Sequence, residues 1–162
     1  VRSGSPFFGR RGQVIVGRML GAGNADGAFD AAVRMIAWSV VVGLAFALVL
    51  APLYDLLPHA FTGDGRVLHE AHELWPFLCV LQPIGGAVFA LDGILIGASD
   101  TQYLMWSMLA ASAIFITLAV LALERHWGIV GVWSALDVLL IARLVLLGAR
   151  FRGRRWAVTG WG

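Results

Sequence analysis

Four long apolar segments dominate the pattern of hydrophobic and polar positions along the chain. They run over residues 35–57, 77–98, 104–123 and 128–149. Each approaches or exceeds the roughly 20 residues that an α-helix needs to cross about 30 Å of hydrocarbon. The interior of a bilayer offers no water to backbone groups, so we expect helices and not strands. The pattern therefore predicts an all-α membrane protein with about four transmembrane helices.

The connections between these segments indicate how the spans are oriented. Residues 58–74 form a long polar connection, whereas residues 99–103 and 124–127 form short ones, which makes neighbouring spans antiparallel. The arginines on the side of the two chain ends are Arg2, Arg10, Arg11, Arg18, Arg34, Arg150, Arg152, Arg154 and Arg155, against Arg66 and Arg125 on the other side. Because basic residues favour the cytoplasmic side, we expect both ends of the chain to be cytoplasmic.

The segments outside the spans have their own patterns. Residues 1–12 are polar and arginine-rich, and we expect them to be disordered or non-native. Residues 13–20 are apolar but too few to span, which predicts a partial helix whose beginning is missing. The glycine-rich stretch after it lacks the βαβ context of a dinucleotide site, so we interpret it as a tight turn with Asn24 and Asp26 as helix caps. Residues 157–162 are expected to form a cytoplasmic tail.

Composition agrees with a membrane protein. Of the 162 residues, 59% are hydrophobic and 14% are charged, whereas soluble domains carry about 25% charged residues. The basic residues are all arginine and gather toward the ends, which suits a lipid bilayer better than a nucleic-acid groove. We therefore expect a membrane partner and no nucleic acid. Tryptophans at the predicted span ends, where an aromatic belt would lie, are Trp75, Trp106, Trp127 and Trp156.

Three charged residues inside the apolar segments are the candidate functional residues: Asp92, Asp137 and Arg143. A charge near the middle of a membrane helix costs roughly 2.5–3.5 kcal/mol, and such residues mark ion or proton pathways. Counting along the helices places Asp92 at about the depth of Arg143, so we hypothesise that they form an ion pair. Alternatively, Arg143 extends to the headgroups, Asp92 serves helix packing, and Asp137 hydrogen-bonds a neighbouring helix without titrating.

Other polar residues point less strongly to function. Three histidines and two glutamates in the 58–74 connection could suggest a metal, yet we interpret this stretch as a solvated loop and expect no metal site. Prolines in or beside spans, Pro52, Pro76 and Pro83, predict kinks or broken helices. The glycine pairs Gly17/Gly21 and Gly93/Gly97 are spaced for close helix approach. No nucleophile and base stand at a recognisable spacing, so we expect neither an enzyme nor a cofactor.

Three stretches carry a family resemblance: VGRMLGAGNADGA before the first span, LQPIGGAVFALDGILIGASDT at the end of the second, and RLVLLGARFRGRRW at the end of the last. Together they resemble the C-terminal part of a multidrug and toxic compound extrusion (MATE) transporter of the DinF-like branch. The resemblance implies a twelve-helix fold of two lobes, of which residues 13–156 would supply helices nine to twelve.

The resemblance also implies a function. Such a protein would be a secondary antiporter of the cytoplasmic membrane that exports small organic or cationic compounds in exchange for protons or sodium, and its partner would be the missing N-terminal lobe. Asp92 departs from the NorM-like branch, whose tenth-helix carboxylate lies about two turns farther from the ASDT-like turn. The alternative from another class is a small four-helix structural or assembly subunit without transport activity.

Overall fold

The computed structural model describes residues 8–157, and it describes side chains from residue 15 onward. Its elements are α1 (Phe8–Gly21), α2 (Ala25–Leu50), a 3-10 turn η1 (Ala51–Leu53), α3 (Leu56–Phe61), α4 (Gly65–Gly97), α5 (Thr101–Glu124) and α6 (Gly128–Arg152). Within this described range there is no strand. Helices α2, α4, α5 and α6 are long and apolar enough to cross a membrane, which confirms the all-α fold with four spans.

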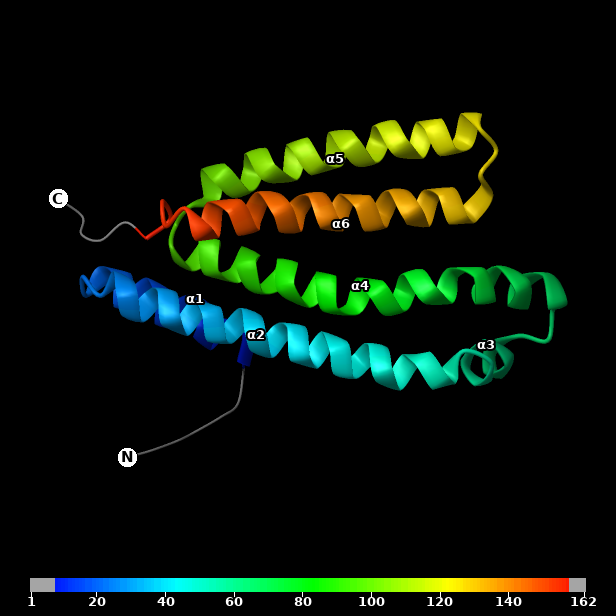
Figure 1. Ribbon diagram of the computed structural model, residues 1–162, viewed down its shortest axis with the longest axis horizontal. Coiled ribbons are helices and arrows are strands. Elements are labelled where there is room, and N and C mark those ends of the chain that lie inside the picture. Colours follow the sequence, from blue (N-terminus) through cyan, green and yellow to red (C-terminus); the bar gives the residue numbers. More distant parts are fainter. Residues whose placement is uncertain (1–7, 158–162) are drawn as a thin grey trace.

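The four long helices lie side by side in one bundle (Figure 1). Helix α6 packs between α5 and α4, and α2 packs on α4, while the shorter α1 contacts both α2 and α4. One end of the bundle contains the α1–α2 turn, the α4–α5 turn and residues 153–157, and we call it the C-terminal end. The opposite end contains α3 and the α5–α6 turn, and we call it the distal end. Helices α4 and α6 both run from the distal end to the C-terminal end.

The turns at the C-terminal end follow from local chemistry. Asn24 caps α2, because its side-chain oxygen accepts a hydrogen bond from the backbone N–H of Gly27 at 2.9 Å, as predicted. Gly23 has φ +78, a conformation that glycine adopts without steric penalty, and it reverses the chain between α1 and α2. The predicted tight turn is therefore confirmed, with Asn24 rather than Asp26 in the capping position.

Two of the predicted spans differ from the helices that contain them. Helix α2 begins at Ala25, before residue 35, and ends at Leu50, before residue 57, and α4 begins at Gly65, before residue 77. The predicted 58–74 loop is instead helical over most of its length, because α3 and the first turns of α4 occupy it. Its arginine and two glutamates are good helix formers that hydropathy does not reveal, and His69 contacts Glu73 one turn later at 3.2 Å.

Two further expectations concern helix continuity. Of the predicted kinks or broken helices, a break is wrong at Pro76 and Pro83, because α4 runs unbroken through both, whereas at Pro52 the α-helix does give way to the 3-10 turn η1. Helix α1 begins at Phe8, so the last residues of the 1–12 segment, which we expected to be disordered or non-native, are helical. Residues 1–7, and residues 158–162 of the predicted tail, lie outside the described range.

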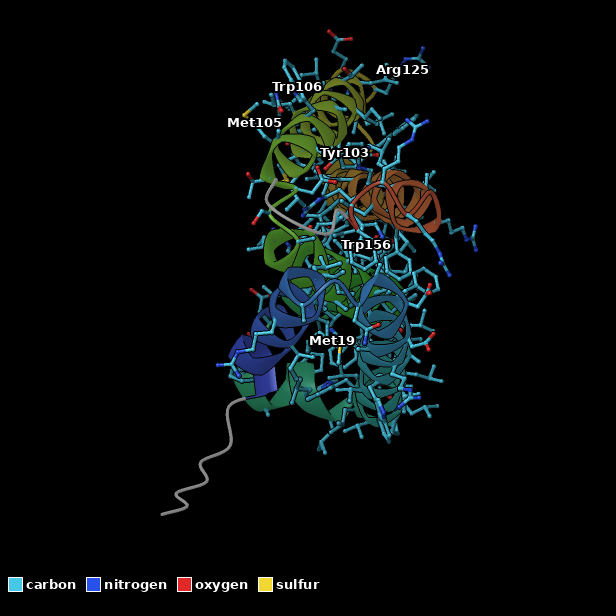
Figure 2. The ribbon with its side chains drawn as sticks, turned by 90° about the vertical axis from the view of Figure 1, so that its left-hand side faces the viewer. Met19, Tyr103, Met105, Trp106, Arg125 and Trp156 are labelled. Atoms are coloured by element: carbon cyan, nitrogen blue, oxygen red, sulfur yellow. The ribbon has the colours of Figure 1, made fainter. Side chains whose placement is uncertain are left out.

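The buried core lies toward the C-terminal end. It is formed by Val16, Leu20, Ala28, Ala32, Val88, Leu91, Ile94, Leu95, Leu147, Phe151 and Trp156. Trp156 is 1% exposed and lies between α6 and α2, so its assignment to an aromatic belt was wrong, as was that of the buried Trp75 (Figure 2). Trp106 and Trp127 are exposed, as belt residues should be. Core residues from several helices, far apart along the chain, thus form the cluster in which Trp156 is buried.

Glycines set the closest approaches between helices. A Cβ on Gly17 would lie 3.0 Å from the carbonyl oxygen of Gly97, which confirms close packing of α1 on α4, whereas Gly21 faces open space. A Cβ on Gly86 would lie 2.6 Å from the carbonyl oxygen of Ser39. A Cβ on Gly43 would meet α4 backbone just as closely. The backbones of α2 and α4 therefore touch directly, as small residues allow in membrane helices.

Candidate functional site

The predicted contact between the two central charges is present. Arg143 donates a hydrogen bond from Nη2 to Oδ1 of Asp92 at 2.7 Å, and their side chains are 12% and 18% exposed. Asp92 comes from α4 and Arg143 from α6, so this ion pair links two helices. The alternative in which Arg143 extends to the headgroups does not describe this arrangement.

The pair lies where the two parallel helices share the apolar core. Leu91 and Leu95 flank Asp92 in sequence on α4, and Leu147 follows Arg143 by one turn on α6, and these three leucines are buried. In such surroundings each charge alone would be strongly unfavourable, and a short charge-assisted hydrogen bond offsets much of that cost. The ion pair therefore neutralises both charges and fixes α4 against α6.

Asp137, the third predicted site residue, is not brought into this pair. It lies on α6 on the distal side of Arg143, and six residues along a helix correspond to about 9 Å of rise. Its Oδ1 atom is buried and has no hydrogen-bond partner among the described residues. The Nε atom of Arg143 is likewise buried without a partner there. The two carboxylates within the predicted apolar segments are thus in different states: Asp92 is paired, and one oxygen of Asp137 is not.

A second ion pair, which sequence analysis missed, joins the α4–α5 turn to the last turns of α6. Arg150 donates from Nε to Oδ2 of Asp100 at 2.7 Å and from Nη2 to Oδ1 at 3.2 Å. The guanidinium also lies 4.8 Å from the ring centre of Tyr103, whose hydroxyl donates to the Leu146 carbonyl at 2.8 Å. Figure 2 shows Tyr103 directed between α5 and α6. The sequence did contain a signal for this pair. Helices α4 and α6 run parallel, and Asp100 and Arg150 follow Asp92 and Arg143 by nearly the same number of residues, so a second contact at that level could have been predicted.

A third pair closes the C-terminal end. Arg154 donates to Asp26 at 2.9 Å and lies over the ring of Phe29, 4.4 Å from its centre. Phe29 stacks on Phe151, and Phe151 stacks on Trp156. Asp26, predicted as a helix cap, instead connects α2 to the turn after α6. All three ion pairs thus involve an arginine of α6 or of the turn that follows it.

The histidines of the predicted loop lie at the distal end, on α3 and α4. His72 stacks on Tyr54, and its Nε2 lies 3.3 Å from Oδ1 of Asp55, in a geometry that is not a hydrogen bond. His59 Nδ1 lies 2.7 Å from the Asp55 carbonyl oxygen. Among the described residues, no group of three or more potential ligands is placed to hold a metal ion. The loop part of the interpretation was wrong, because these residues lie on helices, whereas His59, His69 and the two glutamates are exposed, as a solvated segment requires.

The chain matches known proteins over most of its length. The MatE family model matches residues 12–121. Protein DETOXIFICATION 43 of Arabidopsis thaliana is 31% identical over 69% of this chain and 21% of its own length. Protein DETOXIFICATION 42 of the same plant is 30% identical over 82% of this chain and 25% of its own. No solved structure matches the chain significantly.

A bacterial relative gives the same assignment. The probable multidrug resistance protein NorM of Xylella fastidiosa (strain 9a5c) is 33% identical over 80% of this chain and 29% of its own length. The chain thus spans between a fifth and a third of the length of these curated relatives. Members of the matched family are multi-pass membrane transporters and not enzymes, which agrees with the four spans. The chain therefore belongs to the MatE family, the multidrug and toxic compound extrusion transporters.

Proposed function

We propose that this chain is part of a secondary active antiporter that exports small organic or cationic compounds. The exchanged ion is a proton or sodium, and no other cofactor takes part. The observation that carries the proposal is the match of residues 12–121 to a transporter family, together with four spans that contain charged residues. The name of the Xylella relative, a multidrug resistance protein, supports export of drug-like compounds. We further assign the chain to the DinF-like branch, on the GILIGASDT stretch that ends α4.

The location follows from charge and topology. We place the protein in the cytoplasmic membrane with the C-terminal end of the bundle toward the cytoplasm. Arg150, Arg152 and Arg154 lie at that end, and the basic excess of a membrane protein favours the cytoplasmic side. The bilayer and an N-terminal lobe of the same transporter are the proposed partners, because alternating access in such folds requires two repeats that move about a shared site.

Asp92, Asp137 and Arg143 are the proposed residues of the ion or substrate pathway. They lie inside spans, where ionisable groups usually face a bundle interior or a water-filled cavity. Binding of a cation to an acidic group in one conformation, and its release in the other, would bias the bundle between inward-facing and outward-facing forms. The contribution of the chain is therefore to couple cation occupancy to helix arrangement.

The proposal is tested by efflux. The complete reading frame that contains this chain is expressed in cells that lack their own exporters, and accumulation of the organic cation ethidium is followed by fluorescence. We expect lower accumulation than in cells with an empty vector, and restored accumulation when a protonophore or a sodium ionophore dissipates the driving gradient. Glu124→Gln, which alters an exposed carboxylate at the end of α5 outside the proposed pathway, serves as the control for the effect of a substitution as such. Equal accumulation with and without the protein, across a panel of organic cations, would reject the exporter.

A structural or assembly subunit is the second candidate. The observation that favours it is that the three ion pairs made by arginines of α6 and of the turn after it each bridge separate parts of the bundle, which serves helix association directly. Such a subunit would show no substrate-dependent cation flux after reconstitution. Flux of protons or sodium that follows the addition of an organic cation would exclude it.

A further inference from the structure

The two carboxylates inside the spans differ in what surrounds them, and this difference carries an inference that rests on the proposed antiport function. We propose that Asp137 is a proton-binding site, at which the carboxylate takes up one proton to become a neutral carboxylic acid and later releases it. Asp92, by contrast, stays ionised as the partner of Arg143 and positions α4 against α6. Proton binding is thereby assigned to α6 and not to the charge pair.

The first support is the state of the Asp137 oxygen. Oδ1 is buried, and no described residue donates a hydrogen bond to it. Asp137 is half-buried, and an ionised carboxylate within a span is disfavoured when a buried oxygen lacks a partner, so uptake of a proton removes the unfavourable charge. Asp92 has no such need, because Arg143 already donates to it at 2.7 Å. A carboxylate whose charge is balanced by a guanidinium has little attraction left for a further cation.

The second support is the position of other charged groups around Asp137. Helix α6 packs against α5 and α4. On α5 the titratable residues are Tyr103 and Glu124, which lie at its two ends. Glu124 lies at the distal end, where α6 begins, and Asp137 lies about 14 Å farther along the axis of α6. On α4 the acidic residue nearest in depth is Asp92, which lies at the level of Arg143, about 9 Å from Asp137 along the helix axis, and already accepts a hydrogen bond from Arg143.

The remaining charged groups of α4 and α6 lie nearer the ends of the bundle. On α4 they are Arg66, His69, Glu70, His72 and Glu73 in its first turns, and on α6 they are Arg150 and Arg152 in its last turn. Cys79 is the remaining titratable side chain of α4 and is uncharged in its thiol form. The charge of Asp137 therefore has no countercharge of its own on the packed helices, which makes protonation the available way to neutralise it.

The third support distinguishes a proton from sodium. Sodium sites in transporters draw on carbonyl oxygens of unwound helix segments in addition to carboxylates. Helix α6 is continuous from Gly128 to Arg152, so the carbonyls beside Asp137 are used within the helix. Ser134, one turn before Asp137, donates its hydroxyl to the Val130 carbonyl at 2.8 Å. One carboxylate on a continuous helix is sufficient for a proton but is a poor ligand set for sodium.

The test is site-specific labelling with dicyclohexylcarbodiimide, which reacts with protonated carboxyl groups in apolar surroundings. The full chain in lipid nanodiscs is labelled over a series of pH values, and the adducts are located by peptide mass spectrometry. We expect an adduct on Asp137 and little on Asp92. Above the pH at which Asp137 loses its proton, each further pH unit should lower its adduct about tenfold. Replacing choline chloride by sodium chloride should leave the adduct unchanged.

Three variants and their outcomes complete the test. Asp137→Asn should lose the adduct, and Glu124→Gln should keep it. Arg143→Gln removes the partner of Asp92 and should create an adduct there, which shows that the reagent reaches this depth. Absence of an adduct on Asp137 at every pH, or an adduct on Asp92 in the unaltered chain, would overturn the proposal. Protection of Asp137 from labelling by sodium would mean that the site binds sodium and not a proton, which would also overturn the proposal. Because labelling requires no transport, its failure is distinguishable from failure of the efflux experiment.

Discussion

The two ends of the bundle are connected in different ways, and α6 shows the contrast within one helix. Near the C-terminal end, Leu147 is fully buried and Phe151 is 7% exposed. Toward the distal end, Ile129 and Leu136 of the same helix are exposed. The side that meets the core at one end of α6 is therefore largely uncovered at the other.

The polar contacts show the same asymmetry. At the C-terminal end, Arg143, Arg150 and Arg154 connect α6 and the turn after it to α4, to the α4–α5 turn and to α2. At the distal end, Trp75 of α4 donates to the Leu50 carbonyl of α2, and Gly131 of α6 packs on Ala122 of α5. These distal contacts hold α2 on α4 and α6 on α5, but they do not join one pair of helices to the other.

This difference indicates where stability and movement reside. Burial and ion pairing both favour the C-terminal end, so most of the folding free energy is expected to come from there. Regions with few buried contacts open most easily. The α2–α4 and α5–α6 pairs are therefore expected to separate first at the distal end, and matched substitutions at the two ends should have unequal effects.

The largest effect is expected from breaking the central ion pair. Arg143→Ala leaves Asp92 unpaired among apolar side chains, and removing one partner of a buried pair costs about 3–5 kcal/mol. Unfolding of the chain in mixed detergent micelles, titrated with sodium dodecyl sulfate and followed by circular dichroism, measures the loss. In an Asp92→Asn background the same substitution should cost much less, because the carboxylate that needed a partner is gone. Equal losses in the two backgrounds would show that the pair contributes nothing.

Two tryptophans compare the ends directly. Trp156→Ala removes a fully buried ring that stacks on Phe151 and donates to its carbonyl at 2.9 Å, and we expect a loss of about 3 kcal/mol. Trp127→Ala removes an exposed ring at the distal end, where a loss below about 1 kcal/mol is expected. The same detergent titration measures both variants. Similar losses for the two rings would contradict the asymmetry between the ends.

Adjacent glycines test how closely α2 and α4 pack. Gly86→Ala would place a methyl group 2.6 Å from the backbone oxygen of Ser39, and the forced separation should cost about 1–3 kcal/mol. Gly85→Ala is the matched control, because its methyl group would meet the Phe89 ring at 3.9 Å, an ordinary contact. Alanine also favours the helix over glycine by roughly 0.5–1 kcal/mol, so Gly85→Ala should be neutral or stabilising. If Gly86→Ala were equally neutral, the helices would not be in backbone contact.

Much of the fold could be predicted because hydropathy reports directly on membrane spans. The existence of four helices, their order and the Asp92–Arg143 contact all followed from segment length and from counting residues along helices. The starts of α2 and α4 could not be predicted in this way, because hydropathy shows where an apolar run begins and not where a helix begins. Residues such as Glu70 and His72 extend α4 beyond the apolar stretch that its sequence presents.

The parts that could not be predicted depend on contacts between distant residues. Trp156 has the sequence surroundings of a belt residue, yet it is 1% exposed and stacks on Phe151, which in turn stacks on Phe29 of a distant helix. Arg150 belongs to a basic tail in sequence, yet Asp100 pairs with it across the bundle. Asp137 was recognised as a candidate from its place in a span. The sequence could not show that its oxygen lacks a partner, because this depends on which side chains α4 and α5 place beside it.

The smallest effect is expected at the solvent-exposed pair that closes the C-terminal end. The side chains of Arg154 and Asp26 are 57% and 87% exposed, so water and salt screen their attraction. Asp26→Asn should cost roughly 0–1 kcal/mol, with Asp30→Asn, an exposed carboxylate on the same helix, as the control. The difference between the two variants, measured by detergent titration at low and high salt, should disappear at high salt. A larger loss that persists at high salt would mean that Asp26 acts by ordering the Phe29–Phe151–Trp156 stack and not through its charge, so the C-terminal end would depend on one more residue than its burial indicates.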